Sequence, residues 1–333
     1  MKAIYSNCKG AHLIEKGIVE SMPFGKDFAD KCLLLEKGEI LEEEKKLLKK
    51  HPDAVFLNRK NESVKQIEDV SKIGEILSLF SQNPQEYFDA EIGLAKRKIR
   101  ESVKFDNLLI DASNSVDELN KCINVLSRRL REWFELNCPE ISRKIEDNVK
   151  FAEAVTKKSK KEFLDELSIS SEDSMGADLE ESDLVQIRNL AEEILSMNSL
   201  REKQEKYIDS MMKENCPNIR EVATAGIGAK LIALAGSFQR LATLPASTVQ
   251  ILGAEKALFR HIKTGAKSPK HGIILNHPLV AFSSAKGKAA RQLADKISIA
   301  VKVDFFKGEF IGDKLIKALQ KKLGVKNGSK DVS

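Results

Sequence analysis

Basic side chains crowd one short stretch of the chain, residues 251–278, which reads ILGAEKALFRHIKTGAKSPKHGIILNHP. The stretch holds eight lysine, arginine or histidine residues and a single acidic residue, Glu255. Nothing in it pairs a nucleophile with a base, so its composition does not point to covalent catalysis. It is therefore either a solvated basic surface or a surface that binds an anionic partner.

The spacing within this stretch predicts a helix with one cationic face. Lys256, Arg260 and Lys263 follow the i, i+4, i+7 pattern on a helix over residues 254–264. Gly265 stands at the C-cap position, where a left-handed residue commonly ends a helix. Lysine and arginine on a rigid helix can meet phosphates at fixed spacing, so this face could bind nucleic acid. An ordinary solvated helix face is the alternative.

The rest of the stretch divides into a buried and an exposed part. Leu258 and Ile262 fall on another face of the same helix, and we expect them in the core. Lys267, Lys270 and His271 lie in the loop that follows, where they could approach an RNA backbone or a splayed base. A lone surface histidine without a ligand is the alternative for His271.

The whole chain separates its charges. The net charge is only +5, but residues 221–333 hold 19 Lys+Arg against 7 Asp+Glu, and residues 1–220 hold 36 against 43. A basic terminal third indicates an anionic partner, most often nucleic acid, or a lysine-rich surface that keeps the protein soluble. The five cysteines include no CxxC pair and no ligand cluster, which favours reduced thiols, a cytoplasmic location and no metal site. We expect no signal peptide and no membrane span.

The basic residues must be positioned by the elements of the fold, and the sequence pattern predicts a mainly α protein with a small N-terminal α/β domain. Residues 1–85 carry strand-like runs at 3–7 (AIYSN), 31–36 (KCLLLE) and 54–58 (AVFLN), with helical runs at 42–50 and 70–80. Residues 86–216 predict a coiled-coil hairpin, and residues 217–333 an all-helical domain. An acidic, serine-rich segment, 168–183, is expected to form a mobile, exposed hairpin tip.

Two heptad seams define the hairpin. The first runs through Leu109, Ala112, Val116, Leu119, Ile123, Leu126, Leu130 and Trp133, and the second through Ile187, Leu190, Ile194, Met197, Arg201, Gln204, Ile208 and Met211. Two long helices cannot hide both seams, so we expect a two-fold homodimer. The expected dimerisation seam consists of Leu109, Val116, Leu119, Ile123, Leu126, Leu130, Ile187, Ile194, Met197 and Ile208. Packing of the seam on the chain's own terminal domains is the alternative.

Two segments, 253–278 and 286–315 (KGKAARQLADKISIAVKVDFFKGEFIGDKL), closely resemble the Nop domain. This is the RNA- and protein-binding module of the core proteins of box C/D ribonucleoproteins and of a related spliceosomal protein. The start of the coiled coil, SVKFDNLLIDASNSVDELNKCINVLSRRLREWFELNCPE, is also similar to that family. The likeness spans roughly residues 100–320, and the compact length looks like an archaeal member.

The resemblance implies a scaffold without catalytic activity, cofactor or metal. In the family, the N-terminal domain docks fibrillarin, the RNA 2′-O-methyltransferase, and the coiled coil forms a homodimer. The Nop domain clamps a kink-turn guide RNA that a small ribosomal-protein-like partner has already bound. Base pairing with the guide RNA then selects the nucleotide that is methylated.

The cationic face of the helix over residues 254–264, the loop that follows it and the resemblance together give ten expected RNA-binding residues. They are Gln239, Arg240, Lys256, Arg260, Lys263, Lys267, Lys270, His271, Arg291 and Lys302. Thr243 stands where a relative carries lysine, so the contact set is not identical to that relative's. The alternative function is a coiled-coil interaction scaffold whose basic domain binds an acidic protein or a spliceosomal-type kink-turn RNA. No GxGxxG, P-loop or HExxH pattern favours an enzyme.

Overall fold

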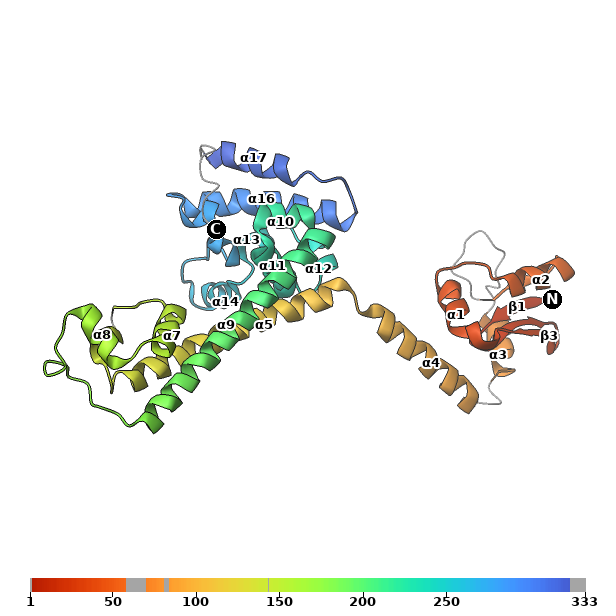
Figure 1. Cartoon of the computed structure of the whole chain (residues 1–333). Helices are drawn as coiled ribbons and strands as arrows, with labels where there is room; N and C mark the ends of the chain where they lie inside the picture. Colours follow the sequence, from red (N-terminus) through yellow and green to blue (C-terminus); the bar gives the residue numbers. More distant parts are fainter. Residues whose placement is uncertain (1, 58–69, 81–83, 143, 324–333) are drawn as a thin grey trace. The chain divides into compact units, whose positions relative to one another are not determined.

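The computed structural model describes residues 2–57, 70–80, 84–142 and 144–323. The chain divides into two compact units, Met1–Val103 and Lys104–Ser333. The boundaries expected at residues 85 and 216 stay predictions. The first unit continues through a further helix to Val103, and the hairpin packs with the terminal helices as one unit. The fold class is confirmed: mainly helical, with a small N-terminal α/β part (Figure 1).

A four-stranded sheet forms the centre of the first unit. Its strands are β1 (Ala3–Ser6), β2 (Gly10–Ile14), β3 (Ile18–Pro23) and β4 (Val55–Phe56), in the order β3-β2-β1-β4. The strand β1 pairs antiparallel with β2, with Ile4 opposite Leu13, and parallel with β4. Alternation along β1 and β2 sends Ile4 and Leu13 to one face and Ala3 and Ile14 to the other, and all four are buried.

Helices cover both faces of this sheet. The helices of this unit that precede residue 80 are η1 (Gly25–Asp27), α1 (Phe28–Glu36), α2 (Glu42–Lys50) and α3 (Val70–Ser78), and α4 (Pro84–Ser102) lies against α1. Leu47 of α2 joins the cluster around Ile4, whereas Ile76 of α3 joins the cluster around Ala3. The strand expected at 31–36 is wrong, because these residues lie in α1. Their apolar run is made of leucine, which favours helices, and contains no β-branched residue.

Two long antiparallel helices, α5 (Phe105–Phe134) and α9 (Glu181–Asn215), form the hairpin of the second unit and run side by side (Figure 1). The segments α6 (Pro139–Ser142), α7 (Asn148–Lys157) and α8 (Lys160–Leu167) lie at its far end. Phe151 of α7 and Phe163 of α8 are fully buried there, and each meets Phe134 edge-on. The turn segments therefore cap the hairpin with a core of their own.

A polar layer separates two apolar clusters along the hairpin. One cluster joins Leu109 and Ile208 to the terminal helices, and the other joins Ile123 and Ile194 to α7 and α8. Between them, Arg201 Nη1 on α9 donates to Asn120 Oδ1 on α5 over 3.2 Å. Arg201, a polar residue of the second heptad seam, thus links the two helices within one chain.

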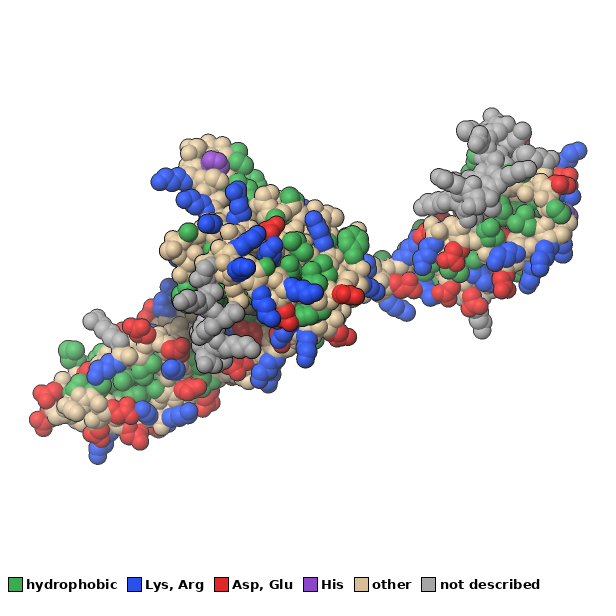
Figure 2. All heavy atoms as spheres, turned by 90° about the horizontal axis from the view of Figure 1, so that it is seen from above, with side chains coloured by type: hydrophobic (Ala, Val, Ile, Leu, Met, Phe, Trp, Pro, Cys, Tyr) green, Lys and Arg blue, Asp and Glu red, His purple; other side chains and the backbone are tan. Residues whose placement is uncertain are grey.

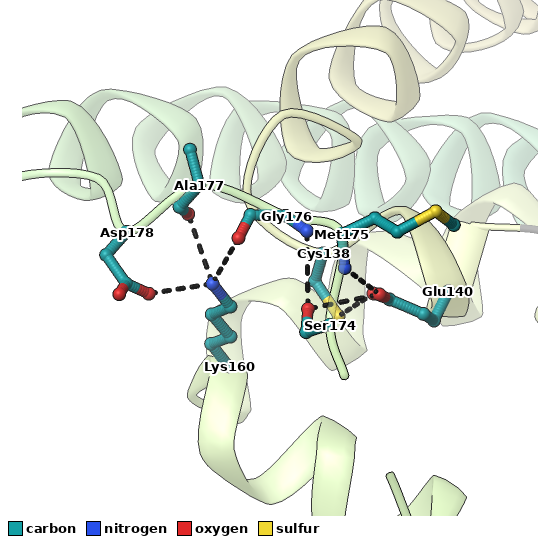
Figure 3. A network of polar contacts seen from close by, with 8 residues as sticks. All are labelled: Cys138, Glu140, Lys160, Ser174, Met175, Gly176, Ala177 and Asp178. Carbon is teal, nitrogen blue, oxygen red and sulfur yellow. Dashed lines mark hydrogen bonds and ion pairs between the residues drawn. The ribbon is translucent and has the colours of Figure 1, made fainter. Parts of the chain in front are cut away.

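The segment 168–183 is mostly exposed, as expected from its composition, and two side chains outside it anchor its backbone. Glu140 accepts hydrogen bonds from the Ser174 hydroxyl and the Met175 amide, at 3.0 and 2.9 Å (Figure 3). Lys160 donates to the carbonyl oxygen of Gly176 at 2.8 Å and to Asp178 at 2.7 Å. A Cβ on Gly176 would lie 2.0 Å from a backbone oxygen, so this close approach requires glycine. Both anchors are single charged residues outside the segment, which its own composition cannot reveal.

The terminal helices pack around one long central helix, α16 (Lys286–Phe305). The others are α10 (Pro217–Ala223), α11 (Ala225–Ala235), α12 (Phe238–Thr243), α13 (Ala246–Ile251), α14 (Glu255–Thr264), η2 (Ile273–Asn276), α15 (Pro278–Ala281) and α17 (Gly312–Leu323). Asp304 near the end of α16 accepts from the backbone amides of Asn218 and Ile219 at 3.2 and 2.9 Å. This buried carboxylate therefore fixes α10 to α16. Burial raises the pKa of Asp304.

Candidate nucleic-acid interface

The expected cationic helix is present, and it lies outside the core. It spans α14, and Gly265 ends it in the left-handed conformation with a φ of 69°. No residue of α14 is buried, and Lys256, Arg260 and Lys263 are all exposed. These three side chains therefore form a cationic ridge that is open to solvent.

The core face expected for this helix is wrong. Ile262 is 69% exposed and the neighbouring Phe259 is 62% exposed, while Leu258 is half-buried. A helix of ten residues buries a face only where another element lies against it, and within the described part of the chain nothing buries Phe259 or Ile262. It carries an exposed apolar face beside its cationic ridge, which is typical of a surface that binds a partner.

The loop after α14 returns to the core through backbone contacts. The His261 ring donates to the carbonyl oxygen of Ala266, which holds the first turn of the loop. The amide of Gly272 then donates to the carbonyl oxygen of Gln250 at 2.8 Å. A Cβ on Gly272 would lie 1.8 Å from the carbonyl oxygen of Leu252, so only glycine fits there.

This return places the loop beside the start of α16. The side chain of Gln250 donates to the carbonyl oxygen of Lys270 at 2.6 Å. The Lys270 side chain lies against Gly287, where a Cβ would be 3.5 Å from its Cδ. Gln250 and Arg291 line the same groove, a cavity of about 370 Å³ between α13 and α16. Arg291 thus lines the groove, and Lys270, which is far from it in sequence, contacts the groove residue Gln250.

Lys302 and Arg240 lie toward the other end of α16. Arg291 and Lys302 are eleven residues apart on α16, which puts them on one face about 16 Å apart. The start of α12 packs there through Phe238, whose ring lies 5.6 Å from that of Phe305. Gln239 and Arg240 follow Phe238 and are exposed. The expected residues therefore form a strip along α16 and a separate ridge on α14.

All ten expected residues are accessible: nine are exposed and His271 is half-buried. In the part of the chain that the structure describes, no ion pair engages any of them. Figure 2 shows lysine and arginine side chains scattered over the terminal helices, whereas acidic side chains gather at the hairpin end that carries α7 and α8. These basic side chains are free to bind an anion.

Only Arg291 among the lining residues of the groove was predicted. The others are Ala246, Ser247, Gln250, Gln292, Asp295, Lys296 and Lys322, and Lys296 pairs with Asp295 at 3.2 Å. Gln292 Oε1 is buried and has no hydrogen-bond partner among the described residues. Lys296 follows Arg291 by five positions, which is about 140° around an ideal helix, so helical spacing does not place the two on one face. Gln250 and Lys322 come from distant helices, and only the packing of the unit reveals them.

The expected dimerisation seam lies inside the single chain. Leu109, Val116 and Ile208 belong to the cluster shared with the terminal helices. Ile123, Leu126, Leu130, Ile187, Ile194 and Met197 belong to the cluster with α7 and α8, and Leu119 is half-buried. The homodimer stays a prediction, and contact with a second copy would have to use residues that this packing leaves exposed.

The described ranges contain neither a metal-binding cluster nor a membrane-spanning helix. No group of three or more His, Cys, Asp or Glu residues is arranged there to hold a metal ion. No helix within those ranges combines the length and the apolar character needed to cross a membrane.

Comparison with known proteins gives consistent matches. The Nop family model, described as a snoRNA binding domain, fibrillarin, matches residues 115–324. An uncharacterized NOP5 family protein of Methanocaldococcus jannaschii is 46% identical over 156 residues, which cover 46% of this chain and 37% of that protein. Nucleolar protein 56 of Dictyostelium discoideum is 46% identical over 134 residues, which cover 40% of this chain and 25% of that protein. Nucleolar protein 58 of Candida albicans is 44% identical over 151 residues, which cover 45% of this chain and 29% of that protein.

The matched segments span about a third or less of the length of these relatives. The solved structure of a fibrillarin/Nop5p complex is 20% identical, with a TM-score of 0.43, and the match covers 96% of this chain and 98% of that chain. The family match over residues 115–324 includes the hairpin except for the start of α5, the cationic ridge of α14 and the groove beside α16. This chain belongs to the Nop family.

Proposed function

We propose that this protein is the non-catalytic scaffold of a box C/D guide ribonucleoprotein. In this proposal the second unit binds a kink-turn guide RNA, and the first unit docks the methyltransferase fibrillarin. The observation that carries the proposal is the cationic ridge of α14, whose three basic side chains are exposed and unpaired among the described residues. Relatives named nucleolar protein 56 and 58, and a family described as snoRNA-binding, support it.

The RNA would contact the ridge on α14 and the strip along α16. Lys256, Arg260 and Lys263 stand one turn apart, so they can meet successive phosphates of a folded backbone. Lys270 and Arg291 flank a groove with amide donors and acceptors, which suits a splayed nucleotide. Charge alone supplies affinity without selectivity, so we propose that the shape of the kinked RNA supplies the selectivity.

A small ribosomal-protein-like partner on the RNA would complete the site. The support for a protein contact is the apolar face of α14, where Phe259 and Ile262 are 62% and 69% exposed beside the basic ridge. RNA alone covers phosphate-binding residues but leaves such an apolar face in water. The binary RNA–protein complex is therefore expected to bind more tightly than the RNA alone.

We further propose a homodimer formed by the hairpin. Because the seam is buried within the chain, the contact would use exposed apolar residues on the outer faces of α5 and α9. Val125, Leu200 and Tyr207 are 54%, 46% and 41% exposed there. A two-fold contact of these faces would present two RNA-binding units in one particle.

Reversing two charges of the ridge tests the RNA site. The Lys256→Glu/Arg260→Glu double variant should fail to assemble on kink-turn RNA bound by the small protein. Gel-shift titration at several salt concentrations measures the loss. Losing two phosphate contacts should also make the slope of log affinity against log salt shallower by about 1.5.

The matched control is Lys157→Glu/Lys161→Glu, which reverses two exposed lysines at the far end of the hairpin. This control should bind the complex like the unchanged protein. If the ridge variant binds as tightly as the control, the RNA site is wrong. Loss of binding to an acidic protein, with RNA binding intact, would favour the interaction scaffold instead.

A further inference from the structure

Helix α4 carries a regular apolar stripe that faces water. Phe88 and Ile99 are 57% and 68% exposed, and Val103, directly after the helix, is 59% exposed. Ala95 is also exposed and Ile92 is half-buried. The five residues follow spacings of 4, 3, 4 and 4, which place them on one side of a helix.

The opposite side of α4 is already occupied within the first unit. A Cβ on Gly93 would lie 3.2 Å from the Phe28 ring of α1. The Arg97 guanidinium pairs with Asp30 on that side, and Lys98, on the flank of the helix between the two sides, pairs with Glu36. The stripe therefore faces away from the contacts that hold α4 to α1.

The stripe has the pattern of a short coiled-coil seam. Phe88, Ile92, Ala95 and Ile99 occupy successive d, a, d and a positions. With 19 residues, α4 is about 28 Å long, which is enough for more than two heptads. Scattered surface apolar residues need no partner, but a continuous stripe on one helix face marks an interaction surface.

The charges of α4 indicate which partner fits. In sequence, its first half carries Glu86, Asp89 and Glu91, and its second half carries Lys96, Arg97, Lys98 and Arg100 with one acid, Glu101, which pairs with Arg97. Two such helices in parallel would place like charges side by side. In antiparallel order, the acidic half of one helix runs along the basic half of the other. The stripe and the charges are thus complementary to themselves, as a two-fold contact requires.

We propose that α4 pairs antiparallel with α4 of a second copy of this chain, with Phe88 opposite Ile99 and Glu91 beside Lys98. The same register places Ile92 opposite Ala95, so each large apolar residue meets an apolar one. In antiparallel coiled coils the flanking position of Glu91 faces that of Lys98. Lys98 keeps free donors for this contact, because its ammonium has three hydrogens and Glu36 takes one.

This pairing goes beyond the proposed function and does not rest on it. The hairpin dimer would use α5 and α9, whereas this contact uses the first unit alone. The two contacts are separable, because each can be changed without touching the other.

Sedimentation of the full chain tests the apolar stripe, in a background that carries Val125→Glu and Leu200→Glu so that the proposed hairpin contact cannot hold the copies together. The Ile99→Glu change should weaken self-association by about a hundredfold or more, because it places a charge where an apolar side chain is buried in both copies. The matched control is Ile262→Glu on α14, since the two isoleucines are almost equally exposed, at 68% and 69%. The control should sediment like the background protein when no RNA is present. Equal sedimentation of all three proteins overturns the proposal.

Charge reversal tests the antiparallel register without relying on the apolar stripe. Glu91→Lys alone should weaken association because two lysines face each other, and Lys98→Glu alone because two glutamates do. Mixing the two variants should restore it, because every lysine then faces a glutamate in the mixed pair. Circular dichroism should show that each variant remains folded, since the exposed Lys98–Glu36 pair contributes little to stability.

The outcomes separate this proposal from the proposed function. Ile99→Glu should leave binding to the RNA–protein complex intact, whereas the ridge variant should leave α4 pairing intact. If the mixture of the two charge variants does not regain self-association, the α4 pairing is overturned and the proposed function is not affected. Loss of stability without loss of association in Ile99→Glu means that the chain itself covers the stripe, which also overturns it.

Discussion

His271 and His277 lie six residues apart in the basic stretch, yet their surroundings give them different roles. His277 is 5% exposed, and its Nδ1 accepts a hydrogen bond from the Leu279 amide at the start of α15. Burial lowers the pKa of His277 to about 4. His271 is half-buried in the exposed loop beside Lys270. His277 is therefore a structural cap, and His271 is the histidine that can reach a ligand.

The buried histidine predicts acid sensitivity. Because the folded pKa lies below the ordinary value of about 6.5, His277 supports the fold fully above pH 6.5 and loses that support as pH falls toward 4. The free energy of unfolding should drop by about 2 kcal/mol between pH 7 and pH 5 on this account. Urea unfolding at the two pH values measures it. His277→Asn keeps a capping acceptor and should lose most of this pH dependence, and an unchanged dependence in that variant would contradict the assignment.

At the scale of the elements, one glycine joins the ridge to the groove. The chain leaves α13, forms α14 and its loop, and returns at Gly272 against the backbone of residues 250–252. That return is what places Lys270 beside α16. The loop is therefore held by close backbone approach, since its own side chains contribute few contacts.

A methyl group at this glycine should disturb both packing and binding. Gly272→Ala would put a Cβ 1.8 Å from a carbonyl oxygen, so the loop must move, at a cost of about 1–3 kcal/mol. We expect a lower thermal midpoint together with weaker binding to the RNA–protein complex. Gly226→Ala on α11 is the matched control, because nothing lies within 4 Å of its added Cβ. It should leave binding unchanged and stabilise the helix slightly. Equal behaviour of the two variants would show that the loop is not anchored at Gly272.

Helical periodicity was sufficient to predict α14, its Gly265 cap and the direction of Lys256, Arg260 and Lys263. It failed for Ile262, because a heptad pattern shows which residues share a face and not whether another element covers that face. It failed for 31–36, where a leucine run fits either a strand or a helix. The sequence predicted Arg291 of the groove beside α16 but not Gln250 or Lys322, because these two reach the groove only through tertiary packing.

At the scale of the whole molecule, the chain keeps its tasks on separate units. The first unit offers a sheet covered by helices and the apolar stripe of α4, whereas the second carries the hairpin, the ridge and the groove. The basic charge is concentrated in the terminal helices, and the rest of the chain is acidic. The proposed scaffold would need this division, because each partner requires a surface of its own.

The most direct test of the scaffold is a reconstitution that omits one component at a time. The full set contains this protein, fibrillarin, the small RNA-binding protein, a guide RNA and a target RNA that carries the complementary sequence. Transfer of a labelled methyl group to the target nucleotide is the readout. The account predicts transfer with the full set, none when this protein is left out, and none when the Lys256→Glu/Arg260→Glu variant replaces it. Undiminished transfer without this protein, or with that variant, would contradict the account.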